Sequence, residues 1–502
     1  GAGRRPGPGG PGRIALRPIL RRGNPSRRLN LSLLCIVFVL SLFAARLVQL
    51  QGLDWSKYRS LAAAQRLQIL QIPAVRGSIT ASDGTILAMT AQTDLVFADP
   101  TQMHPDKRPG YAAKLAGPLG MSQAEILYLL GHHPASKAYV MLSPSVPSDV
   151  GERITKLGIP GIGEKASYAR IYPNQDLAAN LLGFTATSNG DLHGAAGLEY
   201  KNNSLLAGKD GKQEVETGAA GQPIPFTPDK VHPQVPAGNL RLTIQPDLQY
   251  EAEQACKERV QITRAKNCTV VIMQPGTGKI LAMAQYPTFD PADPTSVTAA
   301  TNIPVASVFE PGSTAKVITV AAALERGGQT PMSPYRIPNS IVQNGFPFHD
   351  AETHPTEHLT IAGILAYSSN VGMVQVVQHV SPTVQHRYLQ KFGLGSPTGL
   401  GLPGESPGLL PPVSKWSGDT RYTLSFGQGV AATAVQMASV YATIANGGVR
   451  VSPSVVAGTT NGAGHFTPAP KPASTRVLHP RTAHELMDIL QQVPKVDDLG
   501  GE

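Results

Sequence analysis

Acidic residues are absent from the first 30 positions of this 502-residue chain. The same stretch carries eight arginines: Arg4, Arg5, Arg13, Arg17, Arg21, Arg22, Arg27 and Arg28. They account for nearly all of the net charge of +9, because the other 35 basic residues face 34 acidic ones. A nearly neutral body lacks the positive surface on which nucleic-acid binding depends. We therefore expect no nucleic-acid partner.

Long apolar runs are also scarce, and only residues 29–45 approach the length of a membrane span. This stretch has 17 residues without a charge, and about 17–25 residues cross a bilayer as a helix. The preceding arginines predict a cytoplasmic N-terminus and an exported body on the outer face of the cell membrane. The alternative is a cleaved signal peptide, although no A-x-A site is obvious after the run. We predict, in chain order, a basic tail, a single-pass anchor and a continuing helix: 1–28, 29–50 and 51–70.

Cysteine is rare, with three residues in the whole chain. Cys35 lies in the apolar run, whereas Cys256 and Cys268 lie twelve residues apart in the exported body. Disulfides form in such compartments. The sequence leaves two possibilities open, a Cys256–Cys268 disulfide or two buried thiols.

A proline-rich stretch, 218–239, divides the body into two parts. Residues 51–239 are predicted to form a mixed α/β domain. After residue 240 a strand, a helix and a hairpin precede several apolar helical runs, which predicts a large α+β domain over 240–502. The expected elements are a helix at 245–263, a hairpin at 268–286 and helical runs at 314–326, 359–379 and 431–446.

The stretch "FEPGSTAKVITV" (309–320) holds the only Ser-x-x-Lys of the chain, formed by Ser313 and Lys316. Pro311 and Gly312 predict a helix start there, and the apolar residues that follow predict a buried helix. Residues i and i+3 share a helix face, so the ammonium can reach the hydroxyl. A desolvated lysine is more readily neutral and can act as a base. The pattern indicates a nucleophile and its base, or else a capping serine and a lysine that reaches the surface.

A second element, "AYSSNVGM" (366–373), contains the only Ser-x-Asn, formed by Ser368 and Asn370. Ser-x-x-Lys followed by such an element is typical of penicillin-binding proteins and class A β-lactamases. A hydroxyl beside a Ser–Lys pair can relay a proton to a leaving amine. An asparagine amide can both donate to and accept from a peptide backbone.

Two further stretches only superficially suggest ligand sites. "GTGKI" (276–280) lacks the first glycine and the hydroxyl residue of a phosphate-binding loop, so we interpret it as a hairpin turn. "FHDAETHPTEH" (348–358) packs three histidines and three acids together but fits no common zinc spacing. We interpret it as a polar loop near the active-site cleft and expect neither a cofactor nor a metal.

With these motifs, the chain resembles the class B penicillin-binding proteins, most of all their division-specific group (penicillin-binding protein 3 type). Residues 76–88, 170–184 and 194–211 resemble the family's pedestal motifs, with Ala81-Ser82 where an Asp-Arg pair is usual. Other motifs follow in the family's order: "YPTFDP", "FGLGSPTGLGLPGE", "FGQG" (426–429) and "YATIANGG" (441–448). The resemblance implies a serine-transpeptidase domain, an antiparallel sheet with helices, on a mixed α/β pedestal of the dimerisation type.

The resemblance also implies roles for the candidate residues. Ser313 would attack the D-Ala–D-Ala carbonyl of a peptidoglycan stem peptide, and Lys316 would accept the serine proton. Ser368 would relay a proton to the leaving amine, and Asn370 would hold the donor peptide. β-Lactams would act as inhibitors, and glycan polymerisation would need a membrane glycosyltransferase among other divisome partners.

The family's Lys-Thr-Gly motif does not occur in the sequence. We expect the domain at 240–502 to be incomplete at its C-terminus rather than degenerate. Two other functions remain open: a penicillin-recognising hydrolase or sensor, and a non-catalytic division scaffold. The long pedestal and single span argue against the first, and the presence of Ser313 and Lys316 argues against the second.

Overall fold

The computed structural model describes residues 25–57, 67–131, 139–188, 191–216, 230–293, 296 and 300–494. Most of the predicted basic tail and the end of the chain lie outside these residues. The chain divides into two units, one of Gly1–Gln71 with Lys212–His232 and the other of Ile72–Gly211 with Pro233–Glu502.

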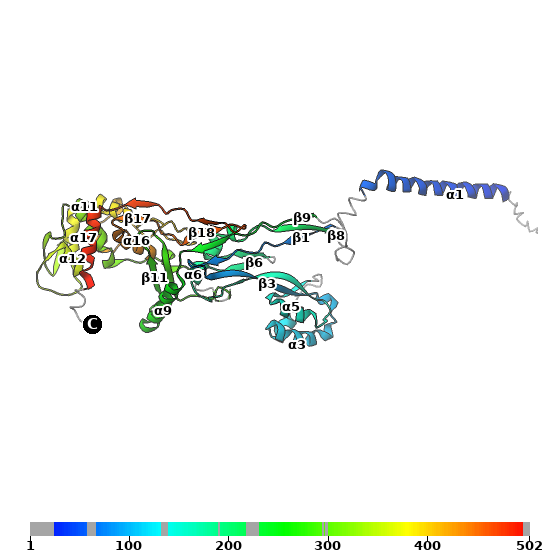
Figure 1. Ribbon diagram of the computed structural model, residues 1–502, viewed down its shortest axis with the longest axis horizontal. Coiled ribbons are helices and arrows are strands. Elements are labelled where there is room, and N and C mark those ends of the chain that lie inside the picture. Colours follow the sequence, from blue (N-terminus) through cyan, green and yellow to red (C-terminus); the bar gives the residue numbers. More distant parts are fainter. Residues whose placement is uncertain are drawn as a thin grey trace, which may run out of the picture. The chain divides into compact units, whose positions relative to one another are not determined.

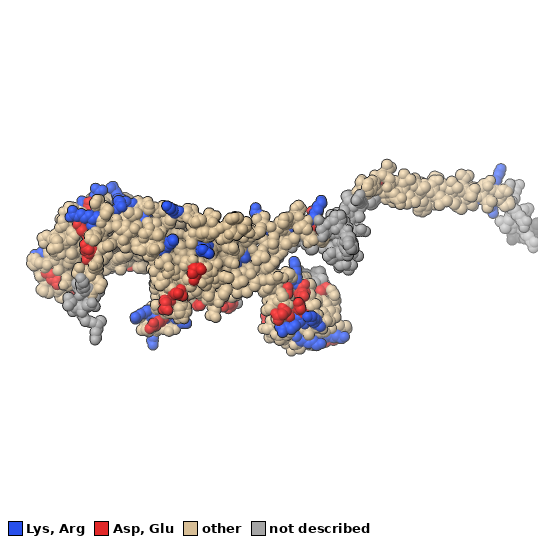
Figure 2. All heavy atoms as spheres, in the orientation of Figure 1, with Lys and Arg blue, Asp and Glu red and all other residues tan. Residues whose placement is uncertain are grey.

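In the first unit an apolar helix, α1 (Pro25–Val48), continues through a short π-helical turn at Gln49–Leu53. Together they form a helix of 29 residues, which is long and apolar enough to cross a membrane. Figure 2 shows few charged side chains along α1. No other helix of the described residues passes the same test. The helix fits a single-pass anchor and contains the predicted span.

The prediction of a helix through residue 70 is wrong at its end. Residues Leu67–Ile72 form strand β1, which pairs with β8 (Gly211–Glu216), and β8 pairs with β9 (Lys230–His232). The sequence "LQILQI" contains two isoleucines, whose branched side chains favour extended backbone.

A seven-stranded sheet runs through the second unit in the order β19–β18–β10–β2–β3–β4, with β5 on β3. Figure 1 labels two of its strands, β3 and β18. Strand β10 pairs in parallel with β2 and antiparallel with β18, so it joins sequence from both sides of the predicted boundary. One core also contains residues from both sides, among them Ile79, Leu240 and Val455. The strands are β2 (Ile79–Thr80), β3 (Ile86–Ala98), β4 (Val140–Val146), β5 (Ile162–Ile171), β10 (Asn239–Leu242), β18 (Val456–Thr460) and β19 (Phe466–Pro468).

Short helices and a small hairpin complete the pedestal. Three helices pack against residues of β3 and β4 and share a separate hydrophobic core with them. The helices are α3 (Arg108–Leu119), α4 (Gln123–Gly131) and α5 (Ser148–Thr155). The remaining elements are α6 (Ala179–Leu182), β6 (Thr185–Ser188), β7 (Asp191–Gly194), α7 (Gly197–Lys201) and α8 (Asn203–Leu206).

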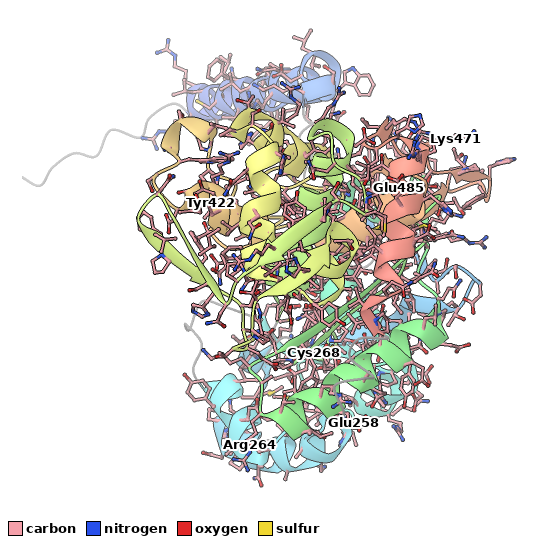
Figure 3. The ribbon with its side chains drawn as sticks, turned by 90° about the vertical axis from the view of Figure 1, so that its left-hand side faces the viewer. Glu258, Arg264, Cys268, Tyr422, Lys471 and Glu485 are labelled. Atoms are coloured by element: carbon pink, nitrogen blue, oxygen red, sulfur yellow. A yellow bond between two sulfur atoms is a disulfide. The ribbon has the colours of Figure 1, made fainter. Side chains whose placement is uncertain are left out.

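The predicted start of the larger domain is confirmed. Helix α9 (Pro246–Thr263) is followed by β11 (Cys268–Met273) and β12 (Ile280–Tyr286), which form an antiparallel hairpin with "GTGK" in its turn. Cys256 and Cys268 form a disulfide, which decides between the two open possibilities. In Figure 3 Cys268 lies beside α9, the helix that carries Glu258. The disulfide therefore ties α9 to the hairpin.

Helices dominate the rest of the domain, as an α+β class requires. The run predicted at 359–379 is broken by a turn at Ser368, and α11, α12 and α17 gather at one end of the unit (Figure 1). The helices are α10 (Ile303–Ala306), α11 (Lys316–Arg326), α12 (Ile361–Ala366), α13 (Asn370–Val376), α14 (Pro382–Lys391), α15 (Thr420–Thr423), α16 (Ala434–Ala445) and α17 (Pro480–Leu490). Short strand pairs lie between them: β13 (Pro334–Ile337) with β16 (Glu357–Thr360), β14 (Ser340–Gln343) with β15 (Phe346–His349), and β17 (Val449–Val451) with β20 (Ser474–Arg476).

A buried charge cluster holds the pedestal together. Arg76, Arg170 and Glu199 come one each from the three stretches that resemble pedestal motifs. The Glu199 carboxylate is fully buried and accepts from Arg76 Nε and Arg170 Nε, both at 2.7 Å. Arg170 also donates to the Gly77 carbonyl at 2.8 Å, and Arg76 donates to Asn203 Oδ1 at 2.7 Å. Each guanidinium therefore links separate segments of the pedestal to one carboxylate.

Replacing Glu199 with alanine should destabilise the pedestal strongly. The variant leaves two guanidinium groups buried without a counter-charge, and such losses cost about 3–5 kcal/mol. Chemical unfolding of the detergent-solubilised chain measures the change. The control is Glu152→Ala, which breaks an exposed 3.1 Å pair with Lys156 and should cost less than about 1 kcal/mol. Equal losses in the two variants would contradict the role given to Glu199.

Candidate active site

Ser313 lies on a tight turn that leads into the buried helix. Residues Gly312–Ala315 form a 3-10 turn and α11 begins at Lys316, slightly later than predicted. Gly312 has a φ of +56°, a left-handed conformation that glycine adopts without steric cost. Lys316, three residues after Ser313, is the first residue of α11 and lies about one helical turn further along the chain. The Ser313 side chain is exposed and open to a substrate.

Lys316 is buried completely, as predicted for a desolvated base. Its ammonium donates to the Ser368 carbonyl oxygen and, at 3.1 Å, to Ser368 Oγ. Burial lowers the pKa of Lys316 to about 8, and the nearby Asp350 carboxylate acts in the opposite direction. Within the described part of the chain, this ammonium is hydrogen-bonded to Ser368 rather than to Ser313. Lys316 is thus held close to the Ser368 hydroxyl. Exclusion of water is the main cause of its lowered pKa.

The Ser-x-Asn element forms the turn between α12 and α13. Ser368 has a φ of +57°, which is uncommon for a residue other than glycine and often marks functional strain. This conformation lets both its carbonyl and its hydroxyl face Lys316. Asn370 is the first residue of α13, and its Nδ2 donates to the His349 carbonyl at 3.3 Å. The structure therefore brings the predicted residues of both motifs into one region.

Asp350 also belongs to this region, although no sequence motif singled it out. It lies in segment 348–358, which we interpreted as a polar loop near the cleft. Its Oδ1 accepts from the backbone N–H groups of Asn370 and Val371, and its Oδ2 accepts from Ser369 Oγ at 2.7 Å. One carboxylate therefore holds the start of α13. No group of three or more metal-ligating side chains suited to an ion occurs among the described residues.

Two glycine-containing motifs, "FGQG" and "YATIANGG", contact the turn that carries Ser313. The N–H of Gly312 donates to the carbonyl of Gly427, from "FGQG", at 3.0 Å. Gly427 has a φ of +82°, and a Cβ there would clash with the Gly312 carbonyl. From "YATIANGG", the Tyr441 hydroxyl donates to the Thr314 carbonyl at 2.9 Å. These contacts fix the backbone that carries Ser313.

Two family models match the chain. A penicillin-binding protein dimerisation domain matches residues 71–242, and a penicillin-binding protein transpeptidase domain matches residues 268–500. Penicillin-binding protein PbpB of Mycolicibacterium smegmatis is 34% identical over 494 residues, which cover 93% of this chain and 76% of that protein. The chain belongs to the penicillin-binding proteins. Peptidoglycan D,D-transpeptidase FtsI of Escherichia coli K12 is 32% identical over 83% of this chain and 70% of its own length.

Solved penicillin-binding proteins have the same fold. A crystal structure of penicillin-binding protein 3 from Mycobacterium tuberculosis, complexed with aztreonam, aligns with a TM-score of 0.64 and 30% identity. The alignment covers 84% of this chain and 76% of that one. The alignment confirms the predicted fold class, a penicillin-binding transpeptidase domain on a mixed α/β pedestal. The roles given to Ser313, Lys316, Ser368 and Asn370 stay predictions.

The contact between Gly427 and Gly312 can be tested with two matched glycines. Gly427→Ala should displace the serine turn and slow acylation of the protein by a fluorescent penicillin by roughly tenfold or more. Gly429 has a similar φ of +74°, but a Cβ there meets only Thr423 Oγ1 at 3.5 Å. Gly429→Ala therefore carries a comparable backbone strain of roughly 1–2 kcal/mol without the clash. Equal slowing in both variants would show that strain alone is responsible.

Proposed function

We propose that this penicillin-binding protein is a membrane-anchored D,D-transpeptidase that cross-links peptidoglycan stem peptides through an acyl-enzyme on Ser313. The observation that carries the proposal is the fully buried Lys316, bonded to Ser368 and one turn away from an exposed Ser313. The D,D-transpeptidase relatives and the β-lactam-bound structure with the same fold support it. β-Lactams would then be its covalent inhibitors.

The proposed reaction has two halves. Ser313 Oγ attacks the carbonyl carbon of the penultimate D-Ala while neutral Lys316 accepts the hydroxyl proton. The tetrahedral intermediate collapses, and the proton passes through Ser368 to the departing terminal D-Ala amine. An amine of a neighbouring stem peptide then attacks the acyl-enzyme, and its proton returns to Ser313 by the same path. The Ser313 backbone N–H supplies one donor to the oxyanion.

Asn370 is the proposed contact to the donor stem peptide. Its Nδ2 donates to the His349 carbonyl at 3.3 Å. An amide oxygen accepts hydrogen bonds and an amide nitrogen carries two donors. The bond to His349 therefore orients the amide while its oxygen and second N–H remain suited to a peptide backbone.

A role in septal cell-wall synthesis is part of the proposal. Its support is the similarity to proteins named FtsI and PbpB. We also propose that a membrane glycosyltransferase and other divisome proteins are its partners. A penicillin-recognising hydrolase or sensor is less well supported, because the pedestal match covers residues 71–242. A non-catalytic scaffold would not need a buried lysine beside an exposed serine.

Acylation of Ser313 should depend on pH through Lys316. A base must be neutral to accept a proton, so the rate of acylation should rise as the pH rises through the Lys316 pKa of about 8. A stopped-flow or gel assay with a fluorescent penicillin gives the rate at each pH. Lys316→Ala should remove the rise, and Ser313→Ala should remove the covalent adduct seen by intact mass. An adduct that persists in Ser313→Ala would refute the assignment of the nucleophile.

The proposed orientation places the N-terminus in the cytoplasm and the catalytic domain on the outer face of the cell membrane. Its motivation is the group of eight arginines that precede the apolar run at residues 29–45, two of which lie in the first turn of α1. A reporter fused before residue 1 should be active only in the cytoplasm, and one fused near residue 240 only outside. Replacing the eight arginines with glutamine should weaken this preference. Cleavage of the chain near residue 45 in cells would instead indicate a signal peptide.

A further inference from the structure

Besides the hydrogen bonds from the start of α13, the Asp350 carboxylate has a further partner in His354. His354 Nε2 lies 3.2 Å from Asp350 Oδ2, and the imidazole is largely buried, with 15% of its side chain exposed. The Asp350 carboxylate is thus surrounded by four donors, from Ser369, Asn370, Val371 and His354. Three of them belong to the turn and helix that carry the Ser-x-Asn motif. The fourth comes from the histidine in its own loop.

The partners of His354 determine its protonation state. Its Nδ1 lies 2.7 Å from the carbonyl oxygen of Pro355, and its Nε2 lies near the Asp350 carboxylate. Both partners are acceptors only, so both ring nitrogens must carry a proton for both hydrogen bonds to form. A neutral imidazole has one N–H and would lose one of the two bonds. Both hydrogen bonds can form together only with the imidazolium form of His354.

We propose that His354, as a doubly protonated imidazolium, is a positioning residue that fixes the Asp350 carboxylate and through it the Ser368–Asn370 turn. The proposal rests on the proposed function for its catalytic meaning, but the placement of the turn can be measured separately. His354 contacts neither the nucleophile nor a substrate. It acts through Asp350, in the same loop, on the first residues of α13.

The charges around His354 set the sign of the pH dependence. Asp350 and Glu357, at 3.9 Å from Nδ1, favour the imidazolium, while Lys316 approaches Asp350 from α11. The pKa of His354 is raised, most of all by the hydrogen bond to the Pro355 carbonyl; burial acts next and lowers it, and Asp350 and Glu357 raise it further. A raised pKa means that the imidazolium stabilises the loop fully below the ordinary histidine pKa. This contribution is lost as the pH rises through the folded value.

Hydrogen exchange of the Asn370 and Val371 amides tests the proposal directly, because these N–H groups donate to Asp350. Exchange is measured on the full detergent-solubilised chain by mass spectrometry from about pH 5.5 to about pH 8.5, the range in which histidine titrates. At the low end, His354→Ala should speed exchange of these amides several-fold to about tenfold, the effect of losing a charge-assisted hydrogen bond. The ratio of wild-type to variant protection should fall as the pH rises.

The matched control is His358→Ala, four residues further along the same segment and exposed, which should leave exchange at Asn370 and Val371 unchanged. A protection ratio for His354→Ala that is constant across the pH range, or equal to that of the control, overturns the proposal. Nitrogen NMR of the wild-type chain labelled at histidine gives a second measurement. Two protonated ring nitrogens on His354 near pH 6 are expected, and a neutral ring there refutes the imidazolium.

The exchange experiment does not depend on catalysis. Ser313→Ala should keep the wild-type exchange of the Asn370 and Val371 amides while abolishing acylation. A failure of the proposed function would therefore appear in the acylation assay alone. A failure of the His354 proposal would appear in the exchange ratios alone.

Discussion

The burial of the Lys316 ammonium is the constraint on which the catalytic region depends. An unpaired cation inside a protein is too costly to persist, so the chain must supply acceptors or let the group become neutral. Both responses occur. Ser368 turns its carbonyl and hydroxyl toward the ammonium, and burial lowers the pKa of Lys316 to about 8. The left-handed backbone of Ser368 follows from this demand, since it brings both oxygens to one point.

In the pedestal, buried cations are paired with a carboxylate, whereas burial in the catalytic region lowers the pKa of Lys316. Arg76 and Arg170 share the Glu199 carboxylate, with further hydrogen bonds to backbone and Asn203 oxygens. Guanidinium groups suit this task because they stay charged and present several donors in a fixed plane. A lysine suits the active site because its pKa moves readily. The same chain thus uses arginine where charge must be permanent and lysine where it must change.

The sequence alone predicted what depends on local pattern. The α9–hairpin start, the helix after Ser313 and the proximity of the Ser-x-x-Lys and Ser-x-Asn motifs follow from apolar periodicity, glycine and proline positions, and the resemblance. It did not predict β1: residues 51–70 were predicted to form one continuing helix, but Leu67–Ile72 pair with β8, and a pairing partner distant in sequence leaves no local signal. It also missed Asp350 and the Gly427–Gly312 contact. Both depend on segments distant in sequence meeting in space, and one sequence carries no signal for such pairs.

Asp350 connects the two titrating groups of the catalytic region. Its negative charge raises the pKa of Lys316 and so opposes the neutral form that a base requires. A cation at His354, 3.2 Å from the same carboxylate, offsets part of that field. The imidazolium would therefore hold the Ser-x-Asn turn and also lessen the charge that Lys316 experiences. Loss of the His354 proton would therefore leave the Asp350 carboxylate with a stronger attraction for the Lys316 proton.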